Sequence, residues 1–286
     1  MKNLAVLITC HNREKITIEC LQSLRICIRP KDFDIRIFLV DDGSQDNTSE
    51  SVRNLFPDVE LIAGDGNLFW AGGMRLAYDY ASSKCDFDFY LLLNDDVKLE
   101  LDVIQRLVAC DEFSVRNFDK KGLYCSSTAD PVTGNITYGA SLITYNLLTF
   151  TSKAVLPQGN PVSCSLSNAN ILLVPKEIIS KLGFFDKRYT HGIADYDFTL
   201  SATKAGFPLL LIPGIGGYCV NDHGNNWLSS SRNLRDRIDY LYSVKGLAYR
   251  ENLYYLDKHF RRQRPYYIMM YWLKTFFPFI WEKFKN

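Results

Sequence analysis

Long hydrophobic runs are missing from this sequence of 286 residues. No apolar stretch reaches the roughly 20 residues that an α-helix needs to span a bilayer. The N-terminus enters an apolar strand pattern directly, without the basic and apolar regions of a signal peptide. We therefore expect a cytoplasmic protein without a membrane-spanning segment.

An excess of charge of one sign is also missing. The chain carries 33 basic and 32 acidic residues, a net charge of +1. Such a balance gives no overall field that favours nucleic acid. One dense basic cluster stands out, formed by Arg261, Arg262 and Arg264. We expect no nucleic-acid partner.

Two short motifs are absent as well. None of the eight cysteines forms a C-x-x-C pair, which argues against zinc-ribbon and thioredoxin-like proteins. Most of them lie in apolar stretches, where a free cysteine acts as a small hydrophobe, and this favours a reducing compartment. The sequence also has no G-x-G-x-x-G, so the fingerprint of a Rossmann dinucleotide site does not fit.

Short apolar runs alternate with helical patterns over the first hundred or so residues. The predicted strands are Leu4–Thr9, Ile35–Val40, Val59–Ala63 and Phe87–Leu93, and the predicted helices include Glu14–Ile26, Met74–Ser82 and Leu99–Cys110. Continuous apolar strands separated by helices indicate a parallel sheet covered on both faces. Ligands of such sheets bind beyond the carboxyl ends of the strands.

The pattern changes after about residue 120. Predicted antiparallel strands cover Gly122–Ser126, Ile136–Tyr138 and Leu142–Phe150, and further short strands cover Asn170–Val174, Leu209–Ile212 and Tyr218–Val220. Helical patterns cover Lys176–Leu182, Ala194–Ala205 and the chain from Arg237 onward. The length fits one large α/β domain with a C-terminal helical extension.

Pairs of carboxylates follow two of the predicted strands. Asp95 and Asp96 would repel each other unless a cation or a hydrogen-bond donor offsets their charge. Magnesium or manganese held by a nucleotide diphosphate would do so, since such ions use one or two carboxylates plus phosphates. The alternative is that Asp96 caps the next helix. Asp41 and Asp42 have the same ambiguity between a cap and a hydrogen bond to a base or ribose.

Three further segments are candidates for a site. The glycine-rich stretch Gly64–Gly73 lets the backbone approach a ligand closely, although a surface loop is the plainer interpretation. Asp195 and Asp197 lie at a predicted helix start, where the macrodipole favours ionised carboxylates, and capping is again the alternative. His223 follows the last short strand and gains interest only as a further metal ligand.

Taken together, these segments resemble the family 2 glycosyltransferases with the GT-A fold. The resemblance covers roughly residues 1–225. Its motifs stand in the family's order and are Thr9–Arg13, Val40–Ser44, Gly66-Asn67 with Ala71–Gly73, Leu93–Asp96, and Gly183–Asp186 followed by Ala194–Phe198 and Lys204–Phe207. The glycine loop resembles that of bacterial rhamnosyltransferase-like members, which makes rhamnose on thymidine diphosphate one donor to test.

The resemblance implies a role for each matching residue. Asp195 matches the catalytic base, Asp96 the main metal ligand and His223 a loop histidine that also binds metal in some members. The implied donor-binding residues are Thr9, His11, Asp41, Asp42, Asn67, Gly72, Gly73 and Asp95. Two departures matter: the metal motif is Asn-Asp-Asp, and Ala194 replaces the glutamate that usually precedes the base, so that Asp195 is the only base candidate there.

The resemblance therefore implies an inverting glycosyltransferase that uses Mg²⁺ or Mn²⁺ and transfers a sugar from a nucleotide diphosphate to a glycan or lipid-linked acceptor in cell-surface polysaccharide synthesis. It divides the chain into a catalytic domain over 1–225, with a nucleotide-binding half at 1–112 and an acceptor-binding half at 113–225, and an extension at 226–286. One alternative is a non-catalytic nucleotide-sugar or carbohydrate-binding protein on the same fold. Another is a sugar nucleotidyltransferase, which the lack of glycine in Thr9–Arg13 disfavours.

The last part of the chain joins basic and aromatic residues. Arginines at 261, 262 and 264 precede the apolar segment Tyr266–Leu273, and Phe276–Trp281 follows. Aromatic side chains beside arginines suit a membrane interface, which would place the protein at the inner face of the membrane. The alternatives are a helix packed on its own domain or on a partner subunit of a homo-oligomer.

Overall fold

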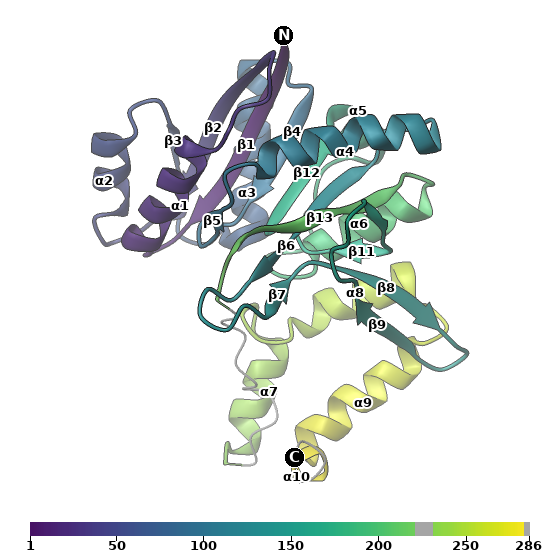
Figure 1. Cartoon of the computed structure of the whole chain (residues 1–286). Helices are drawn as coiled ribbons and strands as arrows, with labels where there is room; N and C mark the ends of the chain where they lie inside the picture. Colours follow the sequence, from purple (N-terminus) through teal and green to yellow (C-terminus); the bar gives the residue numbers. More distant parts are fainter. Residues whose placement is uncertain (221–230, 283–286) are drawn as a thin grey trace.

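The computed structural model describes residues 1–220 and 231–282 (Figure 1). Its strands are β1 (Lys2–Cys10), β2 (Phe33–Asp41), β3 (Glu60–Ala63), β4 (Phe89–Leu93), β5 (Lys98–Leu99), β6 (Leu123–Ala129), β7 (Ile136–Tyr138), β8 (Ala140–Tyr145), β9 (Phe150–Ala154), β10 (Val162–Ser163), β11 (Leu166–Ser167), β12 (Ile171–Pro175) and β13 (Leu209–Tyr218). Its helices are α1 (Glu14–Ile26), α2 (Thr48–Leu55), α3 (Phe69–Lys84), α4 (Val103–Phe118), α5 (Lys176–Leu182), α6 (Ala194–Lys204), α7 (Leu234–Tyr242), α8 (Tyr249–His259), α9 (Arg264–Phe276) and α10 (Phe279–Glu282).

A mostly parallel central sheet organises the described chain. Its main order is β10-β13-β6-β12-β4-β1-β2-β3, with β5 paired to β13 and β7 to β6. The strands β4, β1, β2 and β3 are parallel, as the sequence predicts, whereas β12 runs antiparallel between β4 and β6. A separate small sheet has the order β11-β8-β9.

The central strand β1 shows why its apolar run is uninterrupted. Residues Leu4 to Ile8 are fully buried. Ala5 and Leu7 join the core cluster that also contains residues of α3, α5, α6 and α8, while Leu4, Val6 and Ile8 join the cluster with residues of α1, α2 and α4. Because successive side chains of a strand point to opposite faces, burial on both faces requires an apolar residue at every position.

The C-terminal helices continue from this body (Figure 1). Tyr255, Leu256 and Phe260, in and just after α8, are buried in the same cluster as the side chains of α3 and α6. Phe150 of β9 stacks on Phe260 with 3.9 Å between the ring centroids and also contacts Tyr267 of α9. Helix α8 and the start of α9 therefore pack on the rest of the chain. No described helix is both long and apolar enough to cross a membrane.

Several predicted boundaries are wrong. Helix α3 begins at Phe69 rather than Met74, and α4 at Val103 rather than Leu99, because Leu99 pairs with Gly217 in the sheet. The predicted strand Leu142–Phe150 is a hairpin of β8 and β9. The two short strands predicted between Leu209 and Val220 are one, β13, which ends at Tyr218.

Candidate functional site

The carboxylates after β2 build the loop that follows β3. Asp42 is buried, and its side chain accepts hydrogen bonds from the backbone N–H groups of Gly66 (2.9 Å), Leu68 (3.3 Å) and Phe69 (2.9 Å). It thereby caps α3 from a distant point in the sequence. Asp41 accepts from the Ser44 N–H at 2.9 Å and from the Ser49 hydroxyl, and it thereby supports its own turn. The contact of Asp42 with a base or ribose stays a prediction.

Close packing explains two glycines near this loop. A Cβ on Gly73 would lie 2.1 Å from the Thr9 Oγ1, so α3 rests directly on the end of β1. Gly43 has φ +71°, and a Cβ there would lie 2.9 Å from the Gly66 Cα. Thr9 and Gly73 are thus committed to helix packing. Gly72 is buried beside them in α3, and donor binding by these three residues stays a prediction.

Exposed polar groups border the same loops. The His11 Nδ1 lies 2.6 Å from the Asp42 carbonyl oxygen, which requires a proton on that nitrogen. The Asn12 side chain contacts the other ring nitrogen at 3.0 Å and accepts from the Gln45 N–H at 2.7 Å. Asn67 is exposed, and its N–H donates to Asp65 at 2.8 Å. His11 and Asn67 are therefore placed where a ligand could reach them.

The acidic pair after β4 meets an arginine from the first loop. The Arg13 Nη1 lies 2.9 Å from the Asp96 Oδ2 and 3.3 Å from the Asp95 Oδ1. Burial raises the pKa of Asp95 to about 7, although Arg13 opposes the shift. The Asp96 side chain keeps 20% of its surface exposed and accepts a weak hydrogen bond from the Cys219 thiol at 3.5 Å. Neither carboxylate caps α4.

Hydrogen bonds of Asn94 and Ala169 place the acidic pair and Asp195 at the same part of the fold. The Trp70 Nε1 donates to the Asn94 Oδ1 at 2.8 Å, and the Asn94 N–H donates to the Asn170 carbonyl at 3.1 Å. Next to Asn170, the Ala169 N–H donates to the Asp195 Oδ2 at 3.0 Å. The end of β4 and the starts of α3, β12 and α6 therefore meet at one edge of the sheet.

Asp195 lies in the first turn of α6. Its Oδ1 accepts from its neighbour's N–H, that of Tyr196, at 2.8 Å. Burial raises the pKa of Asp195 to about 6, although the backbone hydrogen bonds from Ala169 and Tyr196 oppose the shift. An aspartate with a pKa near 6 is mostly ionised at neutral pH and is more basic than a solvated one. These properties suit a general base.

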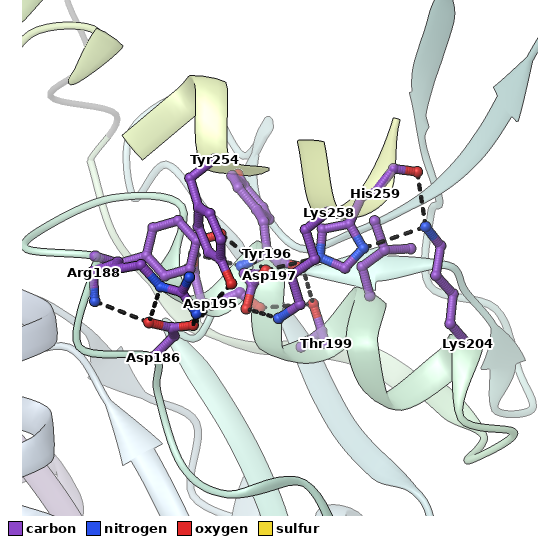
Figure 2. Close-up of polar contacts among 12 residues, drawn as sticks. Asp186, Arg188, Asp195, Tyr196, Asp197, Thr199, Lys204, Tyr254, Lys258 and His259 are labelled. Carbon is purple, nitrogen blue, oxygen red and sulfur yellow. Dashed lines mark hydrogen bonds and ion pairs between the residues drawn. The ribbon is translucent and has the colours of Figure 1, made fainter. Parts of the chain in front are cut away.

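Asp197 faces the other way, into a buried polar cluster (Figure 2). Its carboxylate accepts from the Tyr189 hydroxyl (2.9 Å), the Lys258 Nζ (2.7 Å) and the His259 Nε2 (2.8 Å). Burial alone would raise the pKa of Asp197, but the bonds from His259 and Lys258 lower it below its ordinary value. Asp197 therefore attaches α6 to α8. Both of its carboxylate oxygens accept hydrogen bonds within this cluster.

Strained backbone occurs in the loops around this edge. Three non-glycine residues there have positive φ: Asn12 (52°), Phe69 (52°) and Ile193 (77°). Positive φ is most unusual for a β-branched residue such as Ile193, which directly precedes α6. Such strain, of order 1–3 kcal/mol for each residue, concentrates at functional sites. Nothing in the local sequence predicts it.

The metal that the resemblance implies can be tested against these residues. Asp96 offers oxygen donors of the kind that Mg²⁺ and Mn²⁺ prefer, and a single protein carboxylate suffices where phosphates complete the shell. Within residues 1–220 and 231–282, no three His, Cys, Asp or Glu side chains gather as a metal site. His223 lies outside the described residues. The donor set thus fits a metal that is shared with a nucleotide diphosphate.

Comparison with known proteins agrees with the resemblance. Residues 5–112 match the model of the family described as Glycosyl transferase family 2. No curated protein matches the sequence. Similar solved structures include S. aureus TarS 1-349 in complex with UDP (15% identity, TM-score 0.54, covering 77% of this chain and 60% of that one). The mannosyltransferase PcManGT from Pyrobaculum calidifontis in complex with GDP-Man and Mn²⁺ is also similar (13%, 0.54, 79% and 58%).

A third similar structure is GalNAc-T7 with UDP, GalNAc and Mn²⁺ (14% identity, TM-score 0.60, covering 85% of this chain and 50% of that one). The chain thus spans between half and three fifths of the length of these proteins. At such identities the likeness shows the fold alone. The match over residues 5–112 agrees with the resemblance to family 2 glycosyltransferases in this part of the chain, and the similar structures show that the chain has the GT-A fold.

Proposed function

We propose that this protein is an inverting glycosyltransferase that moves a sugar from a nucleotide diphosphate to a hydroxyl group of a glycan or lipid-linked acceptor in cell-surface polysaccharide synthesis. The carrying observation is the chain of contacts from Asn94, beside the acidic pair, through Asn170 and Ala169 to Asp195. It joins an acidic pair suited to the donor's metal and diphosphate with a carboxylate suited to activate an acceptor.

Asp195 acts as the general base in this proposal. It takes the proton of the acceptor hydroxyl as that oxygen attacks the anomeric carbon, a contribution of typically 10²–10⁴-fold. Attack opposite the departing diphosphate inverts the anomeric centre. The Ala169 and Tyr196 N–H groups hold the carboxylate in one orientation throughout.

Asp96 would hold the divalent ion, and Asp95 and Arg13 lie next to it in the structure. When bound, Mg²⁺ or Mn²⁺ stabilises the negative charge of the departing diphosphate. Arg13 compensates the charge of both carboxylates. The nucleotides present in the similar structures, UDP in one and the sugar donor GDP-Man in another, support a nucleotide-bound sugar.

The proposed division of labour follows the sheet. The half over 1–112 contains the parallel strands β1 to β4 and binds the donor. The half over 113–225 presents Asp195 to the acceptor. The extension over 226–286 contributes α8 to the core and leaves part of α9 and α10 for contact with a membrane. The protein would then work in the cytoplasm at the inner face of the membrane.

The test is release of nucleoside diphosphate from a panel of nucleotide sugars, thymidine diphosphate rhamnose included, with Mg²⁺ or Mn²⁺. We expect slow release from one donor that a chelator abolishes. Asp195→Asn should abolish turnover and leave donor binding intact, whereas Asp96→Ala should weaken metal-dependent donor binding. Donor binding that persists with chelator and in both variants, without turnover in the wild type, would favour a non-catalytic binding protein instead.

A further inference from the structure

A cavity lies away from the proposed donor site. It has a volume of about 450 Å³ and lies between the β8–β9 turn, the end of α6 and the junction of α8 and α9. Residues 145–147 form one wall, and Lys204 and residues 259–263 form the others. None of the lining residues belongs to the acidic pair or contacts Asp195, and none is acidic.

Its walls are fixed by packing and hydrogen bonds. The Gln263 Nε2 donates to the Asn146 carbonyl at 2.7 Å, and the Tyr267 hydroxyl donates to the Phe150 carbonyl at 2.8 Å. Phe260 stacks on Phe150 beneath the cavity. The hairpin and the α8–α9 junction therefore hold each other in place, and the cavity is part of the fold rather than a gap between independent segments.

The cavity is basic. Arg261 and Arg262 are exposed, and the structure shows no ion pair for either among the described residues. The next arginine, Arg264, pairs with Asp257 at 2.9 Å. The third cation, Lys204, donates to the His259 carbonyl at 2.9 Å. Two guanidinium groups without acidic partners in one cavity favour an anion with several oxygens, such as a phosphate group.

Exposed apolar side chains lie at the hairpin turn beside this basic cavity and further along the C-terminal extension. Tyr145, Leu147 and Leu148 at the turn of the hairpin are 73%, 75% and 61% exposed. On the extension, Met269, Phe276, Phe277, Phe279 and Ile280 are also exposed. The sequence from 231 to 286 holds 12 of the 33 basic residues but only 5 of the 32 acidic ones. Basic residues interleaved with exposed leucine and phenylalanine are typical of surfaces that bind anionic membranes.

We propose that this cavity binds the phosphate group of a phospholipid at an anionic membrane surface. Arg261 and Arg262 contact the phosphate, and Tyr145, Leu147 and Leu148 enter the interface beside it. The protein would thus contact the membrane through the hairpin as well as through the C-terminal extension.

The position of the cavity suits the proposed reaction. Lys204 follows Asp195 by nine residues on the same helix, a rise of about 13 Å along its axis. A membrane held at the cavity therefore lies about one helix length from the proposed base. An acceptor sugar carried on a lipid could span that distance. This last step rests on the proposed function, whereas lipid binding itself does not.

The experiment is flotation of the full chain with vesicles, without donor or metal. We expect binding to vesicles of phosphatidylglycerol and phosphatidylcholine, and little binding to phosphatidylcholine alone. The double variant Arg261→Ala/Arg262→Ala should partition about 30-fold more weakly into the anionic vesicles. Leu147→Ser/Leu148→Ser should also weaken binding. The matched control Arg29→Ala/Arg53→Ala removes the same charge from exposed positions outside the cavity and should bind as the wild type does.

Three results would overturn the proposal. Equal weakening in the control variant would show that net charge, not the cavity, attracts the membrane. Binding of inorganic phosphate by the cavity without binding of vesicles would indicate a site for a free anion. Concentration-dependent dimerisation that these substitutions abolish, without vesicle binding, would assign the surface to a second copy of the chain. Thermal unfolding of each variant checks that it is folded, and loss of sugar transfer alone would not affect these readings.

Discussion

Asp195→Asn is expected to make the folded protein more stable at high pH. In the folded state burial raises the pKa of this aspartate from 3.8 to about 6. Between these two values the folded state holds a proton that the unfolded chain has lost, so wild-type stability falls as the pH rises through this window. At about 1.4 kcal/mol for each unit of pKa, the loss amounts to about 3 kcal/mol once the pH is well above 6.

An asparagine has no charge to desolvate, but it has only one carbonyl oxygen for the two backbone donors. Losing one of the hydrogen bonds from Ala169 or Tyr196 costs about 1 kcal/mol. The variant should therefore exceed the wild type by about 2 kcal/mol at pH 8, and this advantage should disappear at pH 4. Urea denaturation of both proteins at several pH values measures the difference in their free energies of unfolding. The contributions of the other titrating groups are the same in both proteins and cancel in this difference.

A difference in stability that stays constant from pH 4 to pH 8 would refute the reasoning, because it would mean that Asp195 is not desolvated. The measurement does not depend on knowing the donor or the acceptor. If Asp195→Asn both abolishes turnover and raises stability, the carboxylate of Asp195 is needed for the reaction and lowers the stability of the folded protein.

Asp197→Asn should have the opposite effect and cost about 1–3 kcal/mol near pH 7, since it weakens the hydrogen bonds from the partly exposed Lys258 and from His259. Because the folded-state pKa of Asp197 is lowered, this cost should fade as the pH falls below the ordinary range of aspartate. Denaturation at pH 3 and 7 would reveal the change, and a pH-independent cost would contradict it. Asp96→Ala should abolish the dependence of donor binding on Mg²⁺ or Mn²⁺, which calorimetry measures. The free energy of unfolding without metal should change little. If the metal dependence is unchanged, Asp96 is not a metal ligand. Gly73→Ala should destabilise the protein by about 1–3 kcal/mol, since the added methyl group would lie 2.1 Å from the Thr9 Oγ1, and a neutral result in urea denaturation would show that α3 shifts easily.

The parallel half of the sheet could be predicted because strands that are buried on both faces consist of uninterrupted apolar residues. The predicted strand Leu4–Thr9 lies within β1, and Phe87–Leu93 contains β4. The predicted helix Glu14–Ile26 matches α1. The antiparallel part was predicted less well because its strands are short and half-exposed. The turn at Asn146, for example, is made by its side chain, which accepts from the Leu148 and Thr149 N–H groups.

The start of α3 could not be predicted from local signals. The glycine-rich stretch before Met74 has the composition of a loop, yet the helix begins at Phe69. Its first N–H groups are satisfied by Asp42, which lies 27 residues earlier. A cap from a distant strand end leaves no pattern in the neighbouring residues. For the same reason the sequence did not predict that Arg13 would pair with Asp95 and Asp96.

The two aspartates of α6 show how the extension bears on the proposed chemistry. Asp195 and Asp197 have opposite pKa shifts although only one residue separates them, and the difference comes from α8, whose Lys258 and His259 reach Asp197 alone. Burial lowers the pKa of His259, so its neutral ring donates from Nε2 to Asp197 and can accept from Lys204 at Nδ1, 3.3 Å away. The first turn of α6 is thus held by residues that lie beyond 225. The position of the proposed base, Asp195, therefore depends on α8, which belongs to the extension. The membrane contact proposed for Arg261 and Arg262 would involve residues directly after α8.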